Sequence, residues 1–402
     1  MDAANREESI DEHFAFRRQR IPTIRISLVA LLLIGLIAAS STAGPFSQLV
    51  IFGDSLSDVG NIAQASFDAY PGPYYYNDRF SNGPVYAEAL SIGLDLGPTV
   101  RSTAGGDNFA YGGAKTSGTG GFEGLFIRDI DEQVDQFLAT RTADPNALFV
   151  VFAGSNDLVG GQTNVSIPIN SLAEDIGRLI TVGARNFLVP NLPLLGYTPR
   201  FNGNPTTLAT YNTRSEQFNA ALATMLDGLE MNNPVITMFR FDVAGLFAQA
   251  LADPAAFGLT NVTNPAAPGL QPGDSSYDTS QIAENPNEYM FWDDLHPTAA
   301  VHAILAERVL QVFALPGDFN HDSVVDAADY VVWRKEIGTA AEYDTWRSHF
   351  GRTAGSGSAG ASPSQTAVPE PASLILLGLA MPCLALLVRR GSEPTKPPPF
   401  RS

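Results

Sequence analysis

The chain has 402 residues, 45% of them hydrophobic, which is enough for one large core with appendages. It carries 42 acidic against 24 basic residues, and its formal net charge of -18 argues against nucleic acid and anionic membrane surfaces as electrostatic partners. Its one cysteine, Cys383, excludes disulfides, cysteine-based zinc sites and thiol catalysis from the rest of the chain.

Residues 1–43 have the pattern of a secretory signal peptide. Arginines at positions 17, 18, 20 and 25 precede an apolar stretch, 28–39, that is too short to span a bilayer comfortably. Residues 41–43 then supply the small side chains that a signal peptidase needs, which predicts cleavage near Ala43. An uncleaved membrane anchor is the alternative.

Residues 45–315 alternate short apolar strands with amphipathic helices, which predicts one α/β domain. The strands are expected at 49–52, 147–153, 186–189 and 235–241, and the clearest helices follow a capping box at 171–174 and begin near Pro297. This alternation implies a parallel sheet covered by helices on both faces. In such sheets the functional residues gather at the carboxyl ends of the strands.

The stretch 53–61, Gly-Asp-Ser-Leu-Ser-Asp-Val-Gly-Asn, follows the first predicted strand and puts Ser55 at a strand-to-turn junction. A serine there, among small and polar neighbours, is well placed as a nucleophile. If Ser57 or Asp58 caps a following helix, Ser55 also lies near that helix's positive end. The stretch differs from the G-x-S-x-G elbow because Ser57 occupies the second glycine position. A simple strand-ending turn is the alternative.

A histidine suited to act as the base occurs near the end of this domain. Residues 293–297 read Asp-Asp-Leu-His-Pro, and the D-x-x-H spacing lets Asp293 hold the Nδ1–H of His296 while Nε2 faces the serine. Asp294 is a rival for the orienting role. His302, on the helix that follows, is expected to be structural.

Two further stretches offer donors for an oxyanion. Residues 154–157, Gly-Ser-Asn-Asp, present the side-chain amide of Asn156, unless they form only an Asx-turn. Residues 108–114, Asn-Phe-Ala-Tyr-Gly-Gly-Ala, contain Gly112 and Gly113, whose backbone can approach a substrate closely.

The four blocks at 53–61, 108–114, 154–157 and 293–297 together resemble those of the GDSL esterases and lipases, also called SGNH hydrolases. The resemblance covers residues 47–313. It implies a flavodoxin-like three-layer α/β/α fold and hydrolysis of carboxylic esters through an acyl-serine intermediate, with no metal or organic cofactor. Residues 79–84, Arg-Phe-Ser-Asn-Gly-Pro, look like the plant-type subgroup, where their role is expected to be shaping the loop after the first helix.

The resemblance also implies roles for individual residues. Ser55 would be the nucleophile, His296 the general base and Asp293 the carboxylate that orients it. The oxyanion hole would consist of the backbone N–H groups of Ser55 and Gly113 and the side chain of Asn156.

The composition changes in residues 316–352. Oxygen ligands recur there at the spacing of an EF-hand loop, and the ligand set would be Asp318, Asn320, Asp322, Asp326, Asp329 and the carbonyl of Val324. A Tyr-x-x-Trp-Arg pattern then occurs twice, at 330–334 and 343–347. The segment resembles a type I dockerin whose second helix lacks its own calcium loop. This implies a structural calcium ion and a cell-surface or matrix partner, and an acidic solvated turn is the alternative.

The C-terminal residues predict a linker and a sorting signal. Residues 353–367 are rich in Gly, Ser and Ala, as in flexible linkers. Residues 368–391 contain Val-Pro-Glu-Pro, an apolar run at 372–388 and two arginines, and resemble a PEP-CTERM tag. That resemblance implies an exosortase-type processing enzyme and a place in the cell envelope or on the outer surface of a Gram-negative-type bacterium. A plain C-terminal transmembrane anchor is the alternative.

The sequence therefore predicts a secreted, surface-sorted serine ester hydrolase that acts on a lipid, an acylated glycan or a simple ester. Two alternatives remain open. An envelope or polysaccharide transacylase or deacetylase would use the same acyl-enzyme, and a non-catalytic surface adhesion module would keep only the fold.

Overall fold

The computed structural model describes residues 45–313, 315–320, 324–335 and 338–352. The predicted signal peptide (1–43), linker (353–367) and sorting signal (368–391) lie outside these residues, and the proposed domain boundaries stay predictions. Within the described ranges, no helix combines the length and the apolar character needed to cross a membrane.

A sheet of four parallel strands forms the centre of the hydrolase domain. The strands are β1 (Leu49–Gly53), β2 (Leu148–Phe152), β3 (Asn186–Pro190) and β4 (Thr237–Phe241), in that spatial order. Every residue of β1 and β2 is buried, as expected for strands covered on both faces. All four strands were predicted from apolar runs, and β4 begins two residues later than expected.

A fifth extended segment, residues 107–111, pairs with the free side of β1. The N–H of Ile51 donates to the Asp107 carbonyl at 2.9 Å, and the N–H of Phe109 donates to the Ile51 carbonyl at 2.7 Å. The spatial order is therefore 107–111, β1, β2, β3, β4, which is the flavodoxin-like order that was predicted. Because the chain changes direction across the sheet at β1, the switch point lies at the carboxyl end of that strand.

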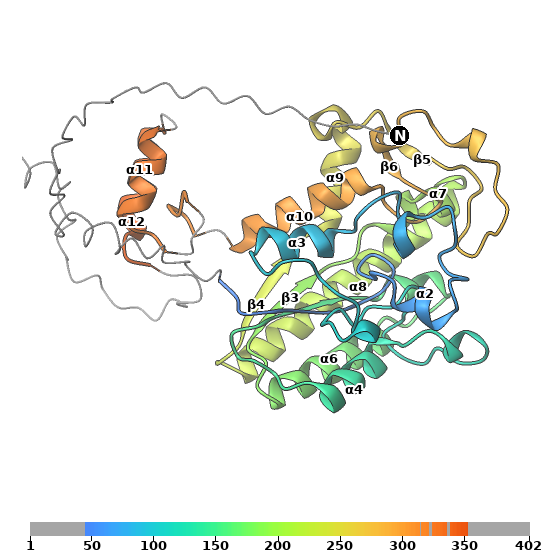
Figure 1. Ribbon diagram of the computed structural model, residues 1–402, viewed down its shortest axis with the longest axis horizontal. Helices are drawn as coiled ribbons and strands as arrows, with labels where there is room; N and C mark the ends of the chain where they lie inside the picture. Colours follow the sequence, from blue (N-terminus) through green and yellow to red (C-terminus); the bar gives the residue numbers. More distant parts are fainter. Residues whose placement is uncertain (1–44, 314, 321–323, 336–337, 353–402) are drawn as a thin grey trace, which may run out of the picture. The chain divides into compact units, whose positions relative to one another are not determined.

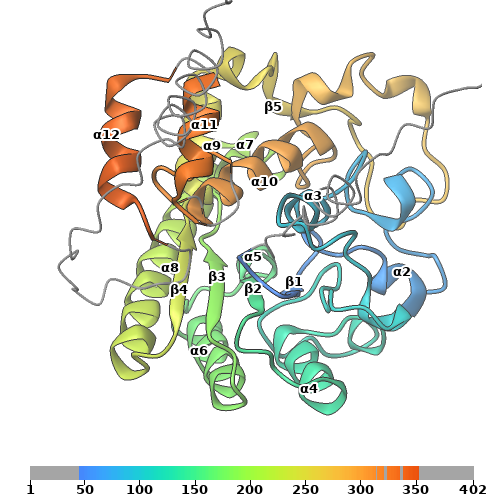
Figure 2. The same cartoon turned by 60° about the vertical axis from the view of Figure 1, so that its left-hand side comes forward.

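Helices cover both faces of this sheet (Figure 1). Helices α4, α6 and α8 lie along one face, and α3 and α10 pack together on the other (Figure 2). The helices of the hydrolase domain are α2 (Asn61–Ala65), α3 (Tyr86–Gly93), α4 (Ile130–Thr140), α5 (Ser155–Val159), α6 (Ser166–Thr181), α7 (Pro199–Asn202), α8 (Pro205–Asn232), α9 (Val243–Ala252) and α10 (Ala299–Phe313).

Shorter elements complete the domain. A second sheet pairs β5 (Asn261–Pro265) with β6 (Tyr289–Phe291). The single 3₁₀ turns are η1 (Tyr76–Asp78), η2 (Ser102–Ala104), η3 (Glu123–Leu125), η4 (Leu195–Tyr197), η5 (Pro254–Phe257), η6 (Thr279–Gln281) and η7 (Pro286–Glu288).

The core between the sheet and α4 is built from phenylalanines. The ring of Phe52 stacks on Phe109 at 5.6 Å and meets Phe137 edge-on at 5.8 Å, and Phe137 meets Phe149 edge-on at 5.6 Å. All four side chains are buried. This packing fixes the strands whose carboxyl ends carry the candidate site.

The capping box predicted at 171–174 is wrong. Helix α6 begins at Ser166, where Asn164 accepts a hydrogen bond from the Ser166 N–H at 3.1 Å, and Ser171 lies inside the helix. Pro168 is tolerated because it falls in the first turn, where the backbone N–H has no helical partner to lose. The S-x-x-E pattern therefore occurs here within a helix rather than at its start.

Residues 315–352 contain two helices, α11 (Ala327–Lys335) and α12 (Ala340–His349). The aromatic repeat joins them: the ring of Tyr330 lies 5.3 Å from that of Trp346, and the Trp346 Nε1–H donates to the Asp326 carbonyl at 2.7 Å. Thr339 and Glu342 form a capping box at the start of α12. The likeness of this helix pair to a dockerin stays a prediction.

Candidate active site

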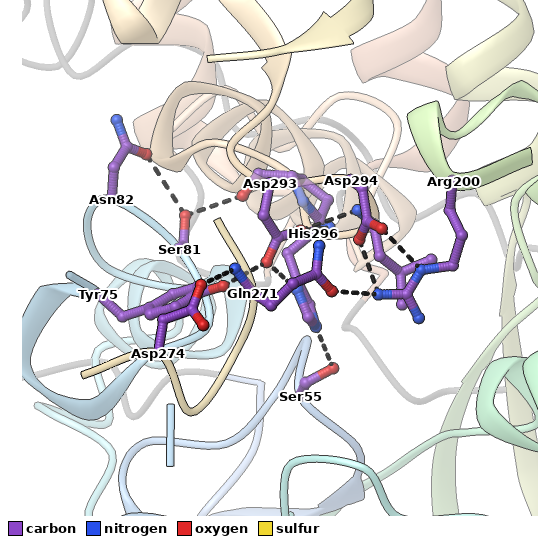
Figure 3. A network of polar contacts seen from close by, with 12 residues as sticks. Ser55, Tyr75, Ser81, Asn82, Arg200, Gln271, Asp274, Asp293, Asp294 and His296 are labelled. Carbon is purple, nitrogen blue, oxygen red and sulfur yellow. Dashed lines mark hydrogen bonds and ion pairs between the residues drawn. The ribbon is translucent and has the colours of Figure 1, made fainter. Parts of the chain in front are cut away.

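Three of the predicted residues meet at the carboxyl end of β1 (Figure 3). The Nε2 of His296 lies 2.9 Å from the Oγ of Ser55, a residue 241 positions away in the sequence. The Nδ1 of His296 lies 2.7 Å from Oδ2 of Asp293. All three side chains are buried. This order of contacts can pass a proton from the serine to an imidazole whose tautomer the carboxylate sets.

The turn at 293–296 decides which aspartate faces the histidine. Oδ1 of Asp293 accepts hydrogen bonds from the backbone N–H groups of Leu295 at 2.8 Å and His296 at 2.7 Å. Asp294 points the other way and forms an ion pair with Arg200 at 2.7 Å. Burial raises the pKa of Asp293, but the charge of His296 and the hydrogen bonds lower it more, so the net pKa lies below its ordinary value.

Tyr75 is an additional contact of this carboxylate that the sequence did not assign. Its hydroxyl donates to Oδ2 of Asp293 at 2.7 Å, the same oxygen that faces His296. Burial, and then the charge of Asp293, raise the pKa of Tyr75, so the hydroxyl keeps its proton. Tyr75 is the middle one of three consecutive tyrosines at 74–76, and nothing in that run signals this contact.

The predicted oxyanion donors follow three neighbouring strands. Gly113 comes after 107–111, Asn156 lies in the first turn of α5 after β2, and Ser55 follows β1. The Asn156 amide is held by a hydrogen bond from Nδ2 to the Ala114 carbonyl at 2.9 Å. Since that group carries two hydrogens, this bond leaves one for a substrate oxygen.

The two adjacent glycines have different partners. The N–H of Gly112 donates to Oδ2 of Asp58 at 2.8 Å, whereas the Gly113 N–H takes no part in the hydrogen bonds found among the described residues. Gly113 has a φ of 82°, and a Cβ on it would lie 2.9 Å from Ile127 Cδ1. Position 113 therefore suits glycine, and Gly113 lines the pocket beside Ser55 and His296.

Asp58 joins the first block to the second. Its carboxylate accepts hydrogen bonds from the N–H groups of Asn61 at 2.7 Å and Ile62 at 3.2 Å, in addition to that of Gly112. Neither predicted residue is the N-cap of α2, which is Gly60; Asp58, two residues earlier, binds the first N–H groups of the helix, and Ser57 Oγ pairs with the Tyr86 hydroxyl at 3.0 Å. Burial raises the pKa of Asp58 to about 6, with these N–H groups acting in the opposite sense.

A pocket of about 320 Å³ opens at Ser55 and His296. Its wall is mainly apolar and includes Ile62, Phe80, Phe122, Phe126 and Ile127. A smaller cavity of about 40 Å³ touches the same serine and histidine and is also lined mostly by apolar side chains.

His302 lies in the wall of the smaller cavity. Its Nδ1 accepts a hydrogen bond from the Tyr86 N–H at 3.2 Å. Burial lowers the pKa of His302 to about 3, so the side chain is neutral at physiological pH. These contacts agree with the structural role expected for it.

The predicted calcium ligands are only partly described, because Asp322 lies outside the described residues. Asp329 is buried, and its carboxylate accepts the N–H of Asn320 at 3.0 Å and of Asp326 at 2.7 Å. Across the described ranges, no group of three or more His, Cys, Asp or Glu side chains could hold a metal ion. The calcium site, including the carbonyl of Val324 and the carboxylate of Asp318, stays a prediction.

A serine, a histidine and a buried aspartate in hydrogen-bond order, at the switch point of a parallel sheet, define the class of serine hydrolases. The family model for GDSL-like lipases and acylhydrolases matches residues 49–309, and the chain belongs to that family. It is therefore a carboxylic ester hydrolase, and members of this family act without a cofactor.

Individual relatives agree with this assignment. The phosphatidylcholine-sterol acyltransferase of Aeromonas hydrophila is 29% identical over 320 residues, which cover 68% of this chain and 93% of that protein. Esterase EstA of Pseudomonas aeruginosa is 28% identical over 351 residues, covering 74% of this chain but 52% of EstA. A GDSL esterase/lipase of Arabidopsis thaliana is 28% identical over 321 residues, which cover 65% of this chain and 86% of that protein.

Among solved structures, one is of a lipolytic G-D-S-L family protein from Veillonella parvula. The alignment covers 66% of this chain and 97% of that protein, at 12% identity and a TM-score of 0.37. The three relatives above are named as an acyltransferase, an esterase and an esterase/lipase. The alternative of a non-catalytic adhesion module receives no support from them.

Proposed function

We propose that this protein is a secreted serine esterase or lipase in which Ser55 forms the acyl-enzyme. The observation that carries the proposal is the hydrogen-bond chain from Ser55 through His296 to Asp293, with distances of 2.9 and 2.7 Å. Asp293 holds the Nδ1–H, which leaves Nε2 free to accept the serine proton.

The reaction proceeds in two balanced steps. As Ser55 Oγ attacks the ester carbonyl, its proton moves to His296, and the N–H groups of Ser55 and Gly113 and the Asn156 amide hold the oxyanion. Collapse breaks the bond to the alcohol, which leaves with the proton from His296. Water then attacks the acyl-serine and gives one proton to His296. Collapse breaks the acyl–Oγ bond, and His296 returns that proton to Ser55 Oγ as the carboxylic acid leaves.

The walls of the pocket favour esters with an apolar acyl chain. Phe126 and Ile127 line it, and at its rim Phe122 is 75% exposed and Leu125, beside it, is 72% exposed. Apolar side chains that continue from the pocket to the surface suit a substrate with a hydrocarbon tail. The names of the relatives, which include lipases, support a lipid substrate.

Acyl transfer is the second candidate function. It is favoured by the relative whose name is phosphatidylcholine-sterol acyltransferase, because this chain spans 93% of that protein. The same acyl-Ser55 would be discharged by a hydroxyl compound in place of water.

The proposal is tested with the full chain on soluble p-nitrophenyl esters of increasing acyl length. We expect Ser55→Ala to lower kcat/KM at least ~10³-fold, while Ser171→Ala, on helix α6, leaves it unchanged. Adding a sterol or a sugar as acceptor and measuring the new ester separates transfer from hydrolysis. Equal activity in the wild type and Ser55→Ala would overturn the proposal.

Secretion and surface sorting are proposed from residues 1–43 and 368–391. An exosortase-type enzyme would then remove the C-terminal tag. Mass spectrometry of the mature protein should recover no peptide beyond about Leu387, and recovery of intact 389–402 from the surface-located form would contradict this.

A further inference from the structure

The motif at 79–84, Arg-Phe-Ser-Asn-Gly-Pro, takes no part in the proposed mechanism but lies against the residues that follow the base. Ser81 Oγ donates to the Pro297 carbonyl at 2.9 Å. Asn82 Oδ1 accepts from the N–H of Ala299, the first residue of α10, at 2.8 Å. Two polar side chains of the motif therefore bind the backbone one and three residues after His296.

Other residues of the motif fix its position. The buried ring of Phe80 lies 5.1 Å from the ring of His296. A Cβ on Gly83 would lie 2.6 Å from the Cβ of Ala299, so this close approach requires glycine. At the other end, Arg79 forms an ion pair with Glu88 of α3 at 2.7 Å. The motif thus connects α3 to the loop that carries the base.

Tyr75 belongs to the same segment and reaches the acid–base pair itself. Its ring lies 6.1 Å from that of Phe80, and the N–H of Tyr76 donates to the Ser81 carbonyl at 2.9 Å. Its hydroxyl donates to Oδ2 of Asp293, as described above. Oδ1 of that carboxylate is held by two backbone N–H groups, so Tyr75 holds the second oxygen.

We propose that residues 75–83 form a positioning element for the base, in which the Tyr75 hydroxyl holds Asp293 in the orientation that His296 Nδ1 requires. This inference rests on the proposed function, because it presupposes that Asp293 and His296 act as a pair. Tyr75 contacts neither the nucleophile nor the pocket and therefore acts only through Asp293. By sharing Oδ2, its hydroxyl also takes up part of the negative charge that would otherwise act on the imidazole.

Other charged and titratable groups face the same pair from the surrounding elements. They are Asp54 after β1, Asp294 with Arg200 of α7, His302 on α10 and, near Tyr75, Asp274. The Tyr75→Phe substitution leaves each of these side chains in place, and the Tyr75 hydroxyl forms its hydrogen bond with Asp293. A change in pH dependence on that substitution therefore reports on the bond between Tyr75 and Asp293.

The test compares Tyr75→Phe with Tyr74→Phe in the full chain. Both lose one hydroxyl, but that of Tyr74 donates to the Ser275 carbonyl at 3.5 Å and accepts the Tyr277 N–H at 3.0 Å, away from the acid–base pair. Without the Tyr75 hydroxyl, more carboxylate charge acts on the imidazole and favours its protonated form. In Tyr75→Phe we expect the acidic side of the pH profile of kcat/KM to move up by about 0.5 pH unit. We also expect the plateau value of kcat/KM to fall about fivefold.

Ser81→Ala provides a second variant. It removes the bond to Pro297 and keeps Tyr75, so we expect kcat to fall about threefold with KM and the acidic side of the pH profile unchanged. Tyr74→Phe should match the wild type in every respect.

The outcomes separate this inference from the proposed function. If the acidic side of the pH profile of kcat/KM is the same in Tyr75→Phe and the wild type, Tyr75 has only a packing role. That result would overturn the inference, even if the melting temperature falls. Unchanged kcat in Ser81→Ala would overturn the positioning role of the motif. By contrast, an inactive wild type or an active Ser55→Ala would contradict the proposed function itself.

Discussion

Asp293 in the hydrolase domain and Asp329 in the segment 316–352 both have fully buried carboxylates, but they bind different donors. Asp293 accepts two backbone N–H groups, the Tyr75 hydroxyl and the imidazole of His296. Asp329 accepts backbone N–H groups, from Asn320 and Asp326. The Asp293 carboxylate is hydrogen-bonded to His296, whose ring reaches Ser55. The Asp329 carboxylate instead holds together backbone segments of its own part of the chain. Burial of an aspartate alone therefore indicates no particular role. The role follows from the hydrogen-bond donors that its carboxylate binds.

The largest effect should separate these two aspartates directly. We expect Asp293→Asn to lower kcat/KM by ~10³- to 10⁴-fold, because an amide no longer sets the histidine tautomer. Asp329→Asn should leave kcat/KM within about twofold of the wild-type value. It should instead speed proteolysis of residues 318–335, because one buried N–H loses its charged acceptor. Steady-state kinetics and limited proteolysis on the same preparations decide this. Equal losses of activity in both variants would contradict the distinction.

Asn156 tests the polar groups on the other side of the nucleophile. As an oxyanion donor its amide should act mainly in the transition state, so Asn156→Ala should lower kcat ~10²-fold with KM nearly unchanged. The exposed Asn264 of β5 provides a control whose loss should have no effect. A rise confined to KM would mean that Asn156 only binds substrate.

Gly113 and Gly118 form a matched pair for the backbone donor. Their φ values are 82° and 83°, but a Cβ on Gly113 would meet Ile127, whereas one on Gly118 would have no neighbour within 4 Å. Both alanine variants carry the same backbone strain, and only Gly113→Ala should also lower kcat, by about tenfold. Equal losses of kcat in both variants would assign the effect to strain alone.

Removal of calcium should have the smallest effect on catalysis. If residues 318–329 bind the ion, a chelator should speed proteolysis near Trp333 and leave ester hydrolysis within about twofold, because the predicted ligands all lie outside residues 45–313. Calorimetry with calcium tests binding separately. No heat of binding at millimolar calcium would remove the calcium site from this account.

The sequence predicted the parts of the fold that depend on local patterns. The apolar run of β1 and the polar residues directly after it are contiguous, so strand and nucleophile could be recognised together. Segment 107–111 was not recognised as a strand, because it contains Asp107 and Asn108 and gains its extended form by pairing with β1. That pairing depends on tertiary structure.

Helix α8 was also missed, although it spans Pro205–Asn232. Its buried residues are only Ser215, Phe218, Leu222 and Leu226, so its apolar stripe is narrow. A local signal was present at its start, where Asn204 accepts the N–H groups of Thr206 and Thr207 and proline occupies the first helical position.

The surroundings of the base could not be predicted from sequence patterns. Tyr75 and Asp293 are 218 positions apart, and no periodicity relates them. The motif at 79–84 was recognised as a pattern, but its contacts with Pro297 and Ala299 exist only in the folded chain. Catalytic blocks carry their chemistry in short stretches, whereas the residues that hold them in place come from distant parts of the chain.

The most direct test of the account is the identity of the acylated residue. The full chain is mixed with a p-nitrophenyl ester, quenched in acid within milliseconds, digested and analysed by mass spectrometry. The account predicts that the mass of the acyl group is found on the peptide containing Ser55, and that the adduct accumulates less than in the wild type when His296 is replaced by alanine. Hydrolysis without an adduct on Ser55, or with the acyl group on another residue, would contradict it.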